Sequence, residues 1–176
     1  MKKYMCLLLA VLLLTMSGCG PGNQEPAQTK LPAPEETWDM SEPPRLTVTC
    51  GDVSFVLNYA RCSWEGPAPN GQINAKIACG ASPLDVRNPP KQFSVGAEDV
   101  QLSFDVPPTS IVINMWEEMR MGNSMTEPVE VLKDVYTFSP HTGLRIYQVV
   151  ATWEGGEYHG EASYHFRLIP GVMPIE

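Results

Sequence analysis

The side chains best suited to binding a metal lie near the C-terminus. His159, Glu161 and His165 occupy alternate positions of an expected strand, so all three side chains would project from one face. However, His159 and His165 are six residues apart, which corresponds to about 20 Å along an extended strand, so one ion could not contact both. We therefore expect ordinary exposed strand residues at these positions and no metal site.

Glu117 and Glu118 are the strongest candidates for acid–base chemistry, because they form a carboxylate pair beside Trp116 and glycosidases use paired carboxylates. Adjacent residues of a strand point to opposite faces, so these two carboxylates would not converge on one substrate. The sequence also contains no Gly-x-Ser-x-Gly turn, phosphate-binding loop, dinucleotide fingerprint, calcium loop or HExxH helix. The residues therefore predict no catalytic group, no cofactor and no metal ion.

Cys50, Cys62 and Cys79 are the three cysteines of the expected folded region. Outside the membrane two of them could form a disulfide, and three pairings are possible. If the strands form a meander, a tight turn after Cys50 keeps it away from Cys62, and a hairpin that turns near Ala68 places Cys62 opposite Asn74. Register therefore favours a disulfide between Cys50 and Cys79. The three thiols lack the close paired spacing that zinc sites usually show.

The N-terminus has the three parts of a secretory signal peptide. A positive Lys2-Lys3 pair precedes an apolar run at residues 5–14, and small polar residues follow as far as Gly18. The apolar run is about ten residues long, whereas a helix needs roughly twenty to cross the hydrocarbon core of a membrane. The sequence therefore predicts a signal peptide over residues 1–18 and not a retained transmembrane helix.

The end of this segment resembles a lipidation site. Met16-Ser17-Gly18-Cys19 is similar to the lipobox of bacterial lipoproteins, in which small residues precede a cysteine whose thiol receives diacylglycerol before cleavage. Met16 stands where most lipoboxes have leucine, and a plain secretory signal is the alternative. The resemblance implies that acyl chains on Cys19 anchor the mature chain at the outer, extracytoplasmic face of the cell membrane, because two or three long chains hold a protein firmly.

Residues 19–44 are expected to form a tether. From residue 20 to residue 44 the chain has six prolines and five acidic residues, with few large apolar groups to bury. The full chain has a net charge of −8, and removal of Lys2 and Lys3 with the signal peptide would bring it to about −10. So acidic a chain offers no basic surface to a phosphate backbone, and we therefore expect no nucleic-acid partner.

From residue 45 to residue 170 apolar and polar residues alternate, which is typical of strands that bury one face. The clearest hairpin joins residues 144–153 to residues 160–168 through a Gly155-Gly156 turn. In the rest of the region, proline, glycine and asparagine recur at regular intervals and indicate turns between strands. Further strands are predicted at residues 46–49, 53–59, 72–78, 100–106, 110–116, 129–132 and 135–138.

This pattern predicts an all-β domain over residues 45–170, followed by a C-terminal tail at residues 171–176. Seven to nine short strands in about 126 residues favour an antiparallel, immunoglobulin-like β-sandwich of two sheets over a closed barrel. Trp64 and Trp116 each end an expected strand, where a large ring could close one end of the core, and Trp153 could close the end at the opposite hairpin.

The domain contains a series of short motifs: Leu46-Thr47-Val48-Thr49-Cys50-Gly51, Cys62-Ser63-Trp64, Ser82-Pro83-Leu84-Asp85, Leu102-Ser103-Phe104-Asp105-Val106, Trp116, Gly122-Asn123, Tyr147-Gln148-Val149-Val150-Ala151-Thr152-Trp153 and Tyr164-His165-Phe166. Together they resemble uncharacterised lipoproteins of Gram-positive anaerobes that carry an immunoglobulin-like β-sandwich. The resemblance covers most of the domain and implies a fold and an extracellular setting, but no catalytic residues. Similar domains are attached to membrane metallopeptidases of the antibiotic-sensing type. Cys62 departs from the family, which usually has tyrosine or another strand residue there.

A methionine-rich stretch is the best candidate for a binding surface. Met115, Met119, Met121 and Met125 surround Trp116 and the turn at Gly122-Asn123, and flexible thioethers beside an aromatic ring make an adaptable contact surface. The alternative is that these methionines fill the end of the sandwich, and burial of all four would remove the basis for a binding loop. The expected recognition loops are residues 64–71 and 117–127, with Trp64, Trp116, Glu117, Met119, Met121 and Asn123 as candidate contact residues.

These features together predict a membrane-anchored lipoprotein that displays a non-catalytic β-sandwich to a protein, a peptide or a component of the envelope. The lipid on Cys19 would be its contact with the membrane, and the sequence does not specify the other partner. One alternative, which rests only on the family resemblance, is an accessory sensor or modulator of a membrane signalling protease. A second alternative is an envelope enzyme, which would need carboxylates or histidines that converge in a cleft.

Overall fold

Almost all of the regular structure in residues 40–171 is β-strand, in agreement with the alternating sequence pattern. These are the residues that the computed structural model describes. The expected signal peptide, Cys19, the tether as far as residue 39, and residues 172–176 of the tail lie outside the described residues. Within the described part, no helix is long and apolar enough to cross a membrane.

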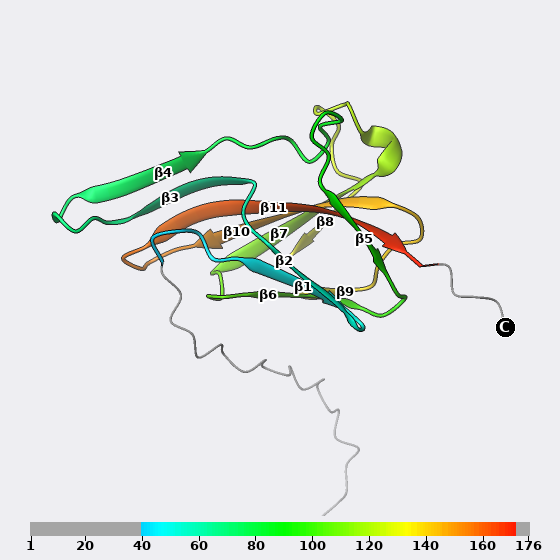
Figure 1. The fold of residues 1–176 in the computed structure, drawn as a ribbon, viewed down its shortest axis with the longest axis horizontal. Coiled ribbons are helices and arrows are strands. Elements are labelled where there is room, and N and C mark those ends of the chain that lie inside the picture. Colours follow the sequence, from blue (N-terminus) through cyan, green and yellow to red (C-terminus); the bar gives the residue numbers. More distant parts are fainter. Residues whose placement is uncertain (1–39, 172–176) are drawn as a thin grey trace, which may run out of the picture. The chain divides into compact units, whose positions relative to one another are not determined.

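Eleven strands and one short 3-10 helix follow one another along this part of the chain (Figure 1). The 3-10 helix, η1, covers Glu118–Arg120. All nine predicted strands are present, although their ends differ from the prediction by a few residues. The strands are β1 (Leu46–Cys50), β2 (Val53–Leu57), β3 (Arg61–Pro67), β4 (Ile73–Ala78), β5 (Lys91–Val95), β6 (Val100–Phe104), β7 (Ser110–Glu117), β8 (Glu130–Lys133), β9 (Thr137–Phe138), β10 (Arg145–Trp153) and β11 (His159–Pro170).

The strands form two sheets that share one hydrophobic core, which confirms the predicted β-sandwich. The smaller sheet has four strands in the order β2-β1-β6-β9, and the larger has seven, six of them in the order β4-β3-β11-β10-β7-β8. The seventh strand, β5, runs parallel to the second half of β11, from Phe166 to Pro170. The eleven strands exceed the seven to nine predicted, and the β5–β11 pair departs from a purely antiparallel arrangement.

Two strands, β3 and β5, lie outside the nine predicted ranges, although a strand that ends at Trp64 was expected. In β3 the buried positions are Cys62, Trp64 and Gly66, so the alternation ends on a residue without a side chain. In β5 the strand is short, and its partner β11 lies at the far end of the sequence. Residues 64–67 are therefore the second half of a strand and not part of a recognition loop, and Trp64 is buried.

The hairpin of β10 and β11 has the turn and the faces that the sequence predicts. Gly155 adopts a φ of 77° in the turn, and Val149 and Ala151 of β10 lie opposite Tyr164 and Ala162 of β11. All four of these strand residues are buried in the core. Because β11 also pairs with β3 and β5 on its other edge, it lies in the middle of the larger sheet.

A cluster of aromatic rings joins the two sheets. Trp64 of β3 and Trp153 of β10 pack edge to face with their ring centroids 5.4 Å apart. Phe104 of the smaller sheet packs against Trp153 and against Tyr164, with centroids 5.7 Å apart in each pair. The prediction that Trp64 and Trp153 close opposite ends of the core is therefore wrong. Both lie opposite Gly160 of β11, one from each side, and this brings their rings together.

The last residues of the predicted tether belong to the folded domain. Pro43 and Pro44 are buried, and the hydroxyl of Tyr164 donates a hydrogen bond to the carbonyl of Pro44. The indole Nε1 of Trp64 donates a hydrogen bond to the carbonyl of Met40 at 2.9 Å. The folded part therefore includes Met40 and does not start at residue 45, because these residues complete the hydrogen bonding of two buried aromatic side chains.

Gly160 occupies a position where the central strands leave no room for a side chain. Its φ is 144°, and a Cβ at this position would lie 2.1 Å from the carbonyl oxygen of Ser63. We expect Gly160→Ala to lower the free energy of unfolding by roughly 2 to 4 kcal/mol, because the backbone of β3 would have to move away from β11. Denaturant unfolding followed by tryptophan fluorescence measures this loss.

Gly155→Ala is the matched control for this variant. Gly155 also has a positive φ, of 77°, but no atom lies within 4 Å of a Cβ at that position. Only the backbone strain of about 1 kcal/mol is expected there. Equal losses of stability in the two variants would contradict the close approach of β3 to β11 at Gly160.

Candidate functional site

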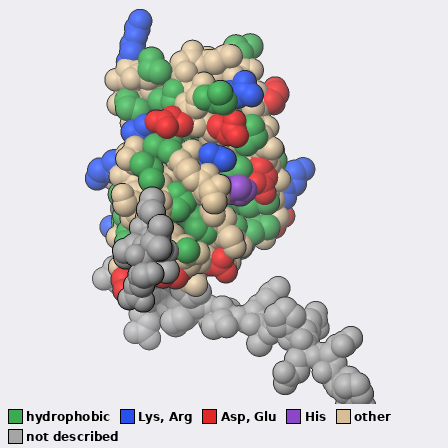
Figure 2. All heavy atoms as spheres, turned by 90° about the vertical axis from the view of Figure 1, so that its right-hand side faces the viewer, with side chains coloured by type: hydrophobic (Ala, Val, Ile, Leu, Met, Phe, Trp, Pro, Cys, Tyr) green, Lys and Arg blue, Asp and Glu red, His purple; other side chains and the backbone are tan. Residues whose placement is uncertain are grey.

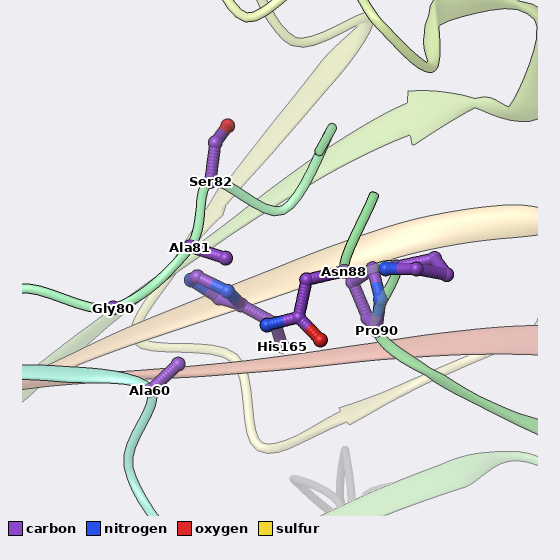
Figure 3. A pocket seen from close by; sticks show the side chains of 8 residues that line it. Ala60, Gly80, Ala81, Ser82, Asn88, Pro90 and His165 are labelled. Atoms are coloured by element: carbon purple, nitrogen blue, oxygen red, sulfur yellow. The ribbon is translucent and has the colours of Figure 1, made fainter. Parts of the chain in front are cut away.

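A shallow pocket lies on the outer face of β11, beside the connection between β4 and β5. Its volume is about 230 Å³. Figure 3 shows the imidazole of His165 between Ala81 on one side and Asn88 on the other. The pocket is lined by Ala60, Gly80, Ala81, Ser82, Asn88, Pro89, Pro90 and His165.

His165 is held in its neutral form in this pocket. Its Nε2 lies 3.3 Å from Oγ of Ser163 and 3.3 Å from Nε2 of Gln148. Burial lowers the pKa of His165 to about 4, with a smaller contribution from the positive charge of Arg61. The prediction of an exposed strand residue is therefore wrong for His165, because residues of the β4–β5 connection pack beside it.

Ser163 and His165 are within reach of each other, like a nucleophile and its base, but their surroundings do not suit that chemistry. Ser163 is only 6% exposed, so a substrate has no access to its hydroxyl. A base with a pKa of about 4 is too weak to remove a serine proton efficiently near neutral pH. What the pocket can do is hold a small polar group against a neutral imidazole, with Ser82 and Asn88 at its walls.

The other residues considered for metal or acid–base chemistry lie apart from this pocket. Nε2 of His159 lies 3.6 Å from a carboxylate oxygen of Glu65, and both side chains are exposed. Glu117 ends β7 and lies 3.8 Å from Arg145, whereas Glu118 begins η1. Within residues 40–171, no group of three or more histidine, cysteine, aspartate and glutamate side chains is arranged to hold a metal ion.

The three cysteines of the described region are free thiols. Cys50 is buried and donates a hydrogen bond to the carbonyl of Glu98 at 2.9 Å. Cys62 is buried opposite Ala78, a register that differs from the predicted one, and Cys79 is exposed. The expected disulfide between Cys50 and Cys79 is not formed, because Cys50 ends a strand of the smaller sheet and Cys79 follows a strand of the larger. Burial raises the pKa of both Cys50 and Cys62, so these thiols stay protonated.

Two of the predicted contact residues support the fold instead of lining its surface. Trp116 is 6% exposed and packs with Leu84 and Ile146 in a second, smaller core cluster, and Met121 packs against the same cluster. The indole Nε1 of Trp116 donates a hydrogen bond to the carbonyl of Thr126 at 2.9 Å. These contacts hold both ends of the loop that follows β7.

Two loops meet over this cluster, and we refer to them together as the paired-loop surface: residues 82–88 and residues 117–127. The backbone N–H of Gly122 donates a hydrogen bond to the carbonyl of Leu84 at 2.8 Å. A Cβ on Gly122 would lie 3.4 Å from the side chain of Val86. The hydrogen bond joins two segments that are separated by more than one strand in the sequence, and Gly122 leaves room for the side chain of Val86.

The paired-loop surface exposes large apolar side chains. Met119 and Met125 are 78% and 89% exposed, and Val86 is 59% exposed, whereas Met115 is buried in the core. Asn123 is exposed as well. Figure 2 shows a face of the molecule on which hydrophobic side chains are interspersed with acidic and basic ones. Sequence reasoning missed Val86, because a single apolar residue in a polar loop has no periodicity.

A second apolar surface lies at the free edge of the larger sheet. Ile73 and Ile77 of β4 are 74% and 76% exposed, and Ala75 between them is also exposed. A shallow pocket of about 290 Å³ lies beside Ile73 at the tip of the β3–β4 hairpin, and Glu157 and His159 line its other side. The alternation in this segment correctly predicts a strand, but it does not reveal that the apolar row faces solvent.

The lowered pKa of His165 makes the stability of the domain depend on pH. A histidine in an unfolded chain has a pKa near 6.5, whereas that of His165 in the fold is about 4. Between these values the unfolded chain binds the extra proton, so this stability is present above about pH 6.5 and is lost as the pH falls toward 4. The loss should reach roughly 3 kcal/mol. Denaturant titrations between these pH values measure the loss, and His165→Gln should remove this component. An unchanged pH dependence in that variant would contradict the partly buried, neutral imidazole.

Comparison with known proteins does not identify a family for this chain. A scan against protein-family models found no match, and searches of curated proteins and of solved structures found none either. The resemblance to lipoproteins of Gram-positive anaerobes therefore stays an expectation from the sequence motifs. The part of that expectation that the structure bears out is the all-β sandwich fold.

Proposed function

We propose that this chain is a lipoprotein, anchored at the outer face of the cell membrane, whose β-sandwich binds a protein, a peptide or another envelope component without catalysing a reaction. The observation that carries the proposal is the exposure of Met119 and Met125 on a loop whose base is held by the buried side chain of Trp116. Methionine side chains adapt to the shape of a partner, and a fixed loop base reduces the entropy lost on binding.

The composition of the paired-loop surface suits a macromolecular partner. Its exposed apolar groups come from both loops, and the second loop also carries exposed charged residues, among them Glu118, Arg120 and Glu127. Protein-binding surfaces combine apolar and polar side chains in this way. The two loops are joined through Gly122 and Leu84, so their side chains can be presented together.

The anchored part of the proposal rests on the N-terminal sequence. The lipobox-like segment ends at Cys19, and twenty residues separate it from Met40, where the described domain starts. The chain reaches the sandwich beside Trp64, which donates a hydrogen bond to Met40. A domain attached in this way would be held near the membrane and remain free to present its loops.

Lipidation can be tested on the full chain in a bacterial host that processes lipoproteins. Metabolic labelling with an alkyne analogue of palmitate should mark the wild-type chain and leave Cys19→Ser unmarked, because the thiol of Cys19 is the acceptor. The variant should also move from the membrane fraction to the soluble fraction. A label that persists in Cys19→Ser, or a wild-type chain without label, would refute the anchor.

The binding surface can be tested by proximity labelling around the anchored full chain. In the double variant Met119→Ser with Met125→Ser, we expect the labelling of specific neighbours to fall about tenfold. The reason is that two exposed apolar side chains are removed from the surface. The stability of this variant should stay within about 0.5 kcal/mol of wild type, because both side chains are exposed.

Val56→Ser provides the control for that experiment, because Val56 is 56% exposed on β2 of the other sheet. It removes an exposed apolar side chain from a different surface and should leave the labelled set unchanged. Identical labelling by the wild-type chain and the methionine variant would show that the paired-loop surface is not the site of binding.

A further inference from the structure

The edge of the larger sheet at β4 is open. Among the described strands, β4 pairs only with β3. Figure 1 shows the β3–β4 hairpin extending beyond the turn that joins β10 to β11. The backbone groups on the outer side of β4 are therefore available to another strand, which is the usual route by which two sheets join edge to edge.

The side chains of β4 are arranged symmetrically about its middle. Ile73 and Ile77 lie two residues to either side of Ala75, and all three are exposed on one face. Asn74 and Lys76 lie one residue to either side of Ala75 on the other face. A second copy of the strand, turned by 180° about Ala75, would place Ile73 opposite Ile77 of the second copy and Asn74 opposite its Lys76.

This antiparallel pairing has no opposed like charges. The positions opposite each other would be two isoleucine pairs, two asparagine–lysine pairs and the alanine at the centre, and apolar pairs across strands favour such a contact. A lysine on an edge strand normally discourages pairing. Here, however, the ammonium of Lys76 forms an ion pair with Glu42 of its own chain and lies 5.4 Å from the centre of the Tyr59 ring. The positive charge of Lys76, which would otherwise discourage pairing at this edge, is thus compensated within each copy.

The opposite edge of the same sheet is less suited to pairing. β8 has only four residues, from Glu130 to Lys133, and it is bounded by Asp134. Nε2 of His141 lies 2.8 Å from a carboxylate oxygen of Glu130. Charged residues and a short length are the usual means by which an edge strand avoids pairing, so the two edges of the larger sheet differ in this respect.

We propose that two copies of this chain associate through β4, with the two strands antiparallel about Ala75, to form a twofold dimer with one continuous sheet. The inference does not depend on the paired-loop surface. A contact made by one short strand is small compared with a standard interface of about 800 Å² per partner, so we expect a weak dimer that forms as the concentration rises. Added salt should strengthen it, since the net charge of each chain is −8.

Cysteine cross-linking of the full chain in mild detergent tests this arrangement. In a Cys79→Ser background, Ala75→Cys would put the two new thiols next to each other at the twofold axis, so a short bismaleimide should give a cross-linked dimer. The native Cys79, with Ala75 unchanged, is the control in the same micelles. Cys79 is exposed, but in the proposed dimer the two copies of Cys79 would be eight residues apart along the pair, roughly 26 Å. It should therefore not be linked.

Charge substitutions on the same background test the register. Ile73→Asp with Ile77→Asp places carboxylates opposite each other twice, and cross-linking should be lost. Ile73→Asp with Ile77→Lys places a carboxylate opposite an ammonium twice, and cross-linking should return. Both positions are exposed, so the variants should fold, and circular dichroism checks that they do.

Three results would overturn the proposal. Equal cross-linking through Cys79 and through position 75 would indicate random collision. Failure of the charge-reversed variant to restore the dimer would exclude this register. Slow hydrogen exchange of the β4 backbone in a chain shown to be monomeric by sedimentation would mean that the edge is already covered within one copy.

Discussion

The backbone of β11 is the constraint on which the rest of the structure depends. A strand of twelve residues in the middle of a sheet must satisfy hydrogen-bonding groups on both of its edges. β10 supplies one edge, whereas the other edge is divided between β3, which pairs as far as Ser163, and β5, which pairs from Phe166 onward. The larger sheet is therefore assembled around β11 from segments that lie far apart in the sequence.

The pocket at His165 is a direct consequence of this division. Ala60, just before β3, and Pro90, just before β5, both line the pocket. The backbones of both residues also contact β11, one on each side of His165. The N–H of Ala60 donates a hydrogen bond to the carbonyl of Ser163 at 2.7 Å, and the side-chain Nε of Arg167 donates one to the carbonyl of Pro90 at 3.0 Å. One partner strand has ended and the other has not yet begun, so the outer face has a recess there. The desolvation that lowers the pKa of His165 has the same origin.

On the inner face, the aromatic residues of β11 and its neighbours decide where the folded part of the chain begins. Tyr164 and Trp64 each have a polar atom that must find an acceptor in a largely buried position. They find it in the carbonyls of Pro44 and Met40. A segment whose composition is that of a tether is thereby held against the sandwich. The loops and the free edge of β4, which carry the proposed contacts, take no part in this hydrogen bonding and are left exposed.

The elements that could be predicted are those whose partners are close in the sequence. The hairpin of β10 and β11 has strong alternation and a two-glycine turn, so its pairing and its buried face both follow from local pattern. The paired-loop surface was predicted in part. Met119 and Asn123 are exposed as expected, but Trp64, Trp116 and Met121 serve the core, because alternation does not show whether a ring at the end of a strand faces inward.

The sequence by itself determined the all-β class, most of the strands and the absence of a recognisable catalytic motif, because these depend on residue type and short-range spacing. Only the tertiary structure decided which face of each strand is buried and which segments meet. In β4 the row of Ile73, Ala75 and Ile77 has the pattern of a core face, yet it faces solvent. The reason is physical: a period of two belongs to the backbone of one strand, whereas burial depends on the strands that pack against it.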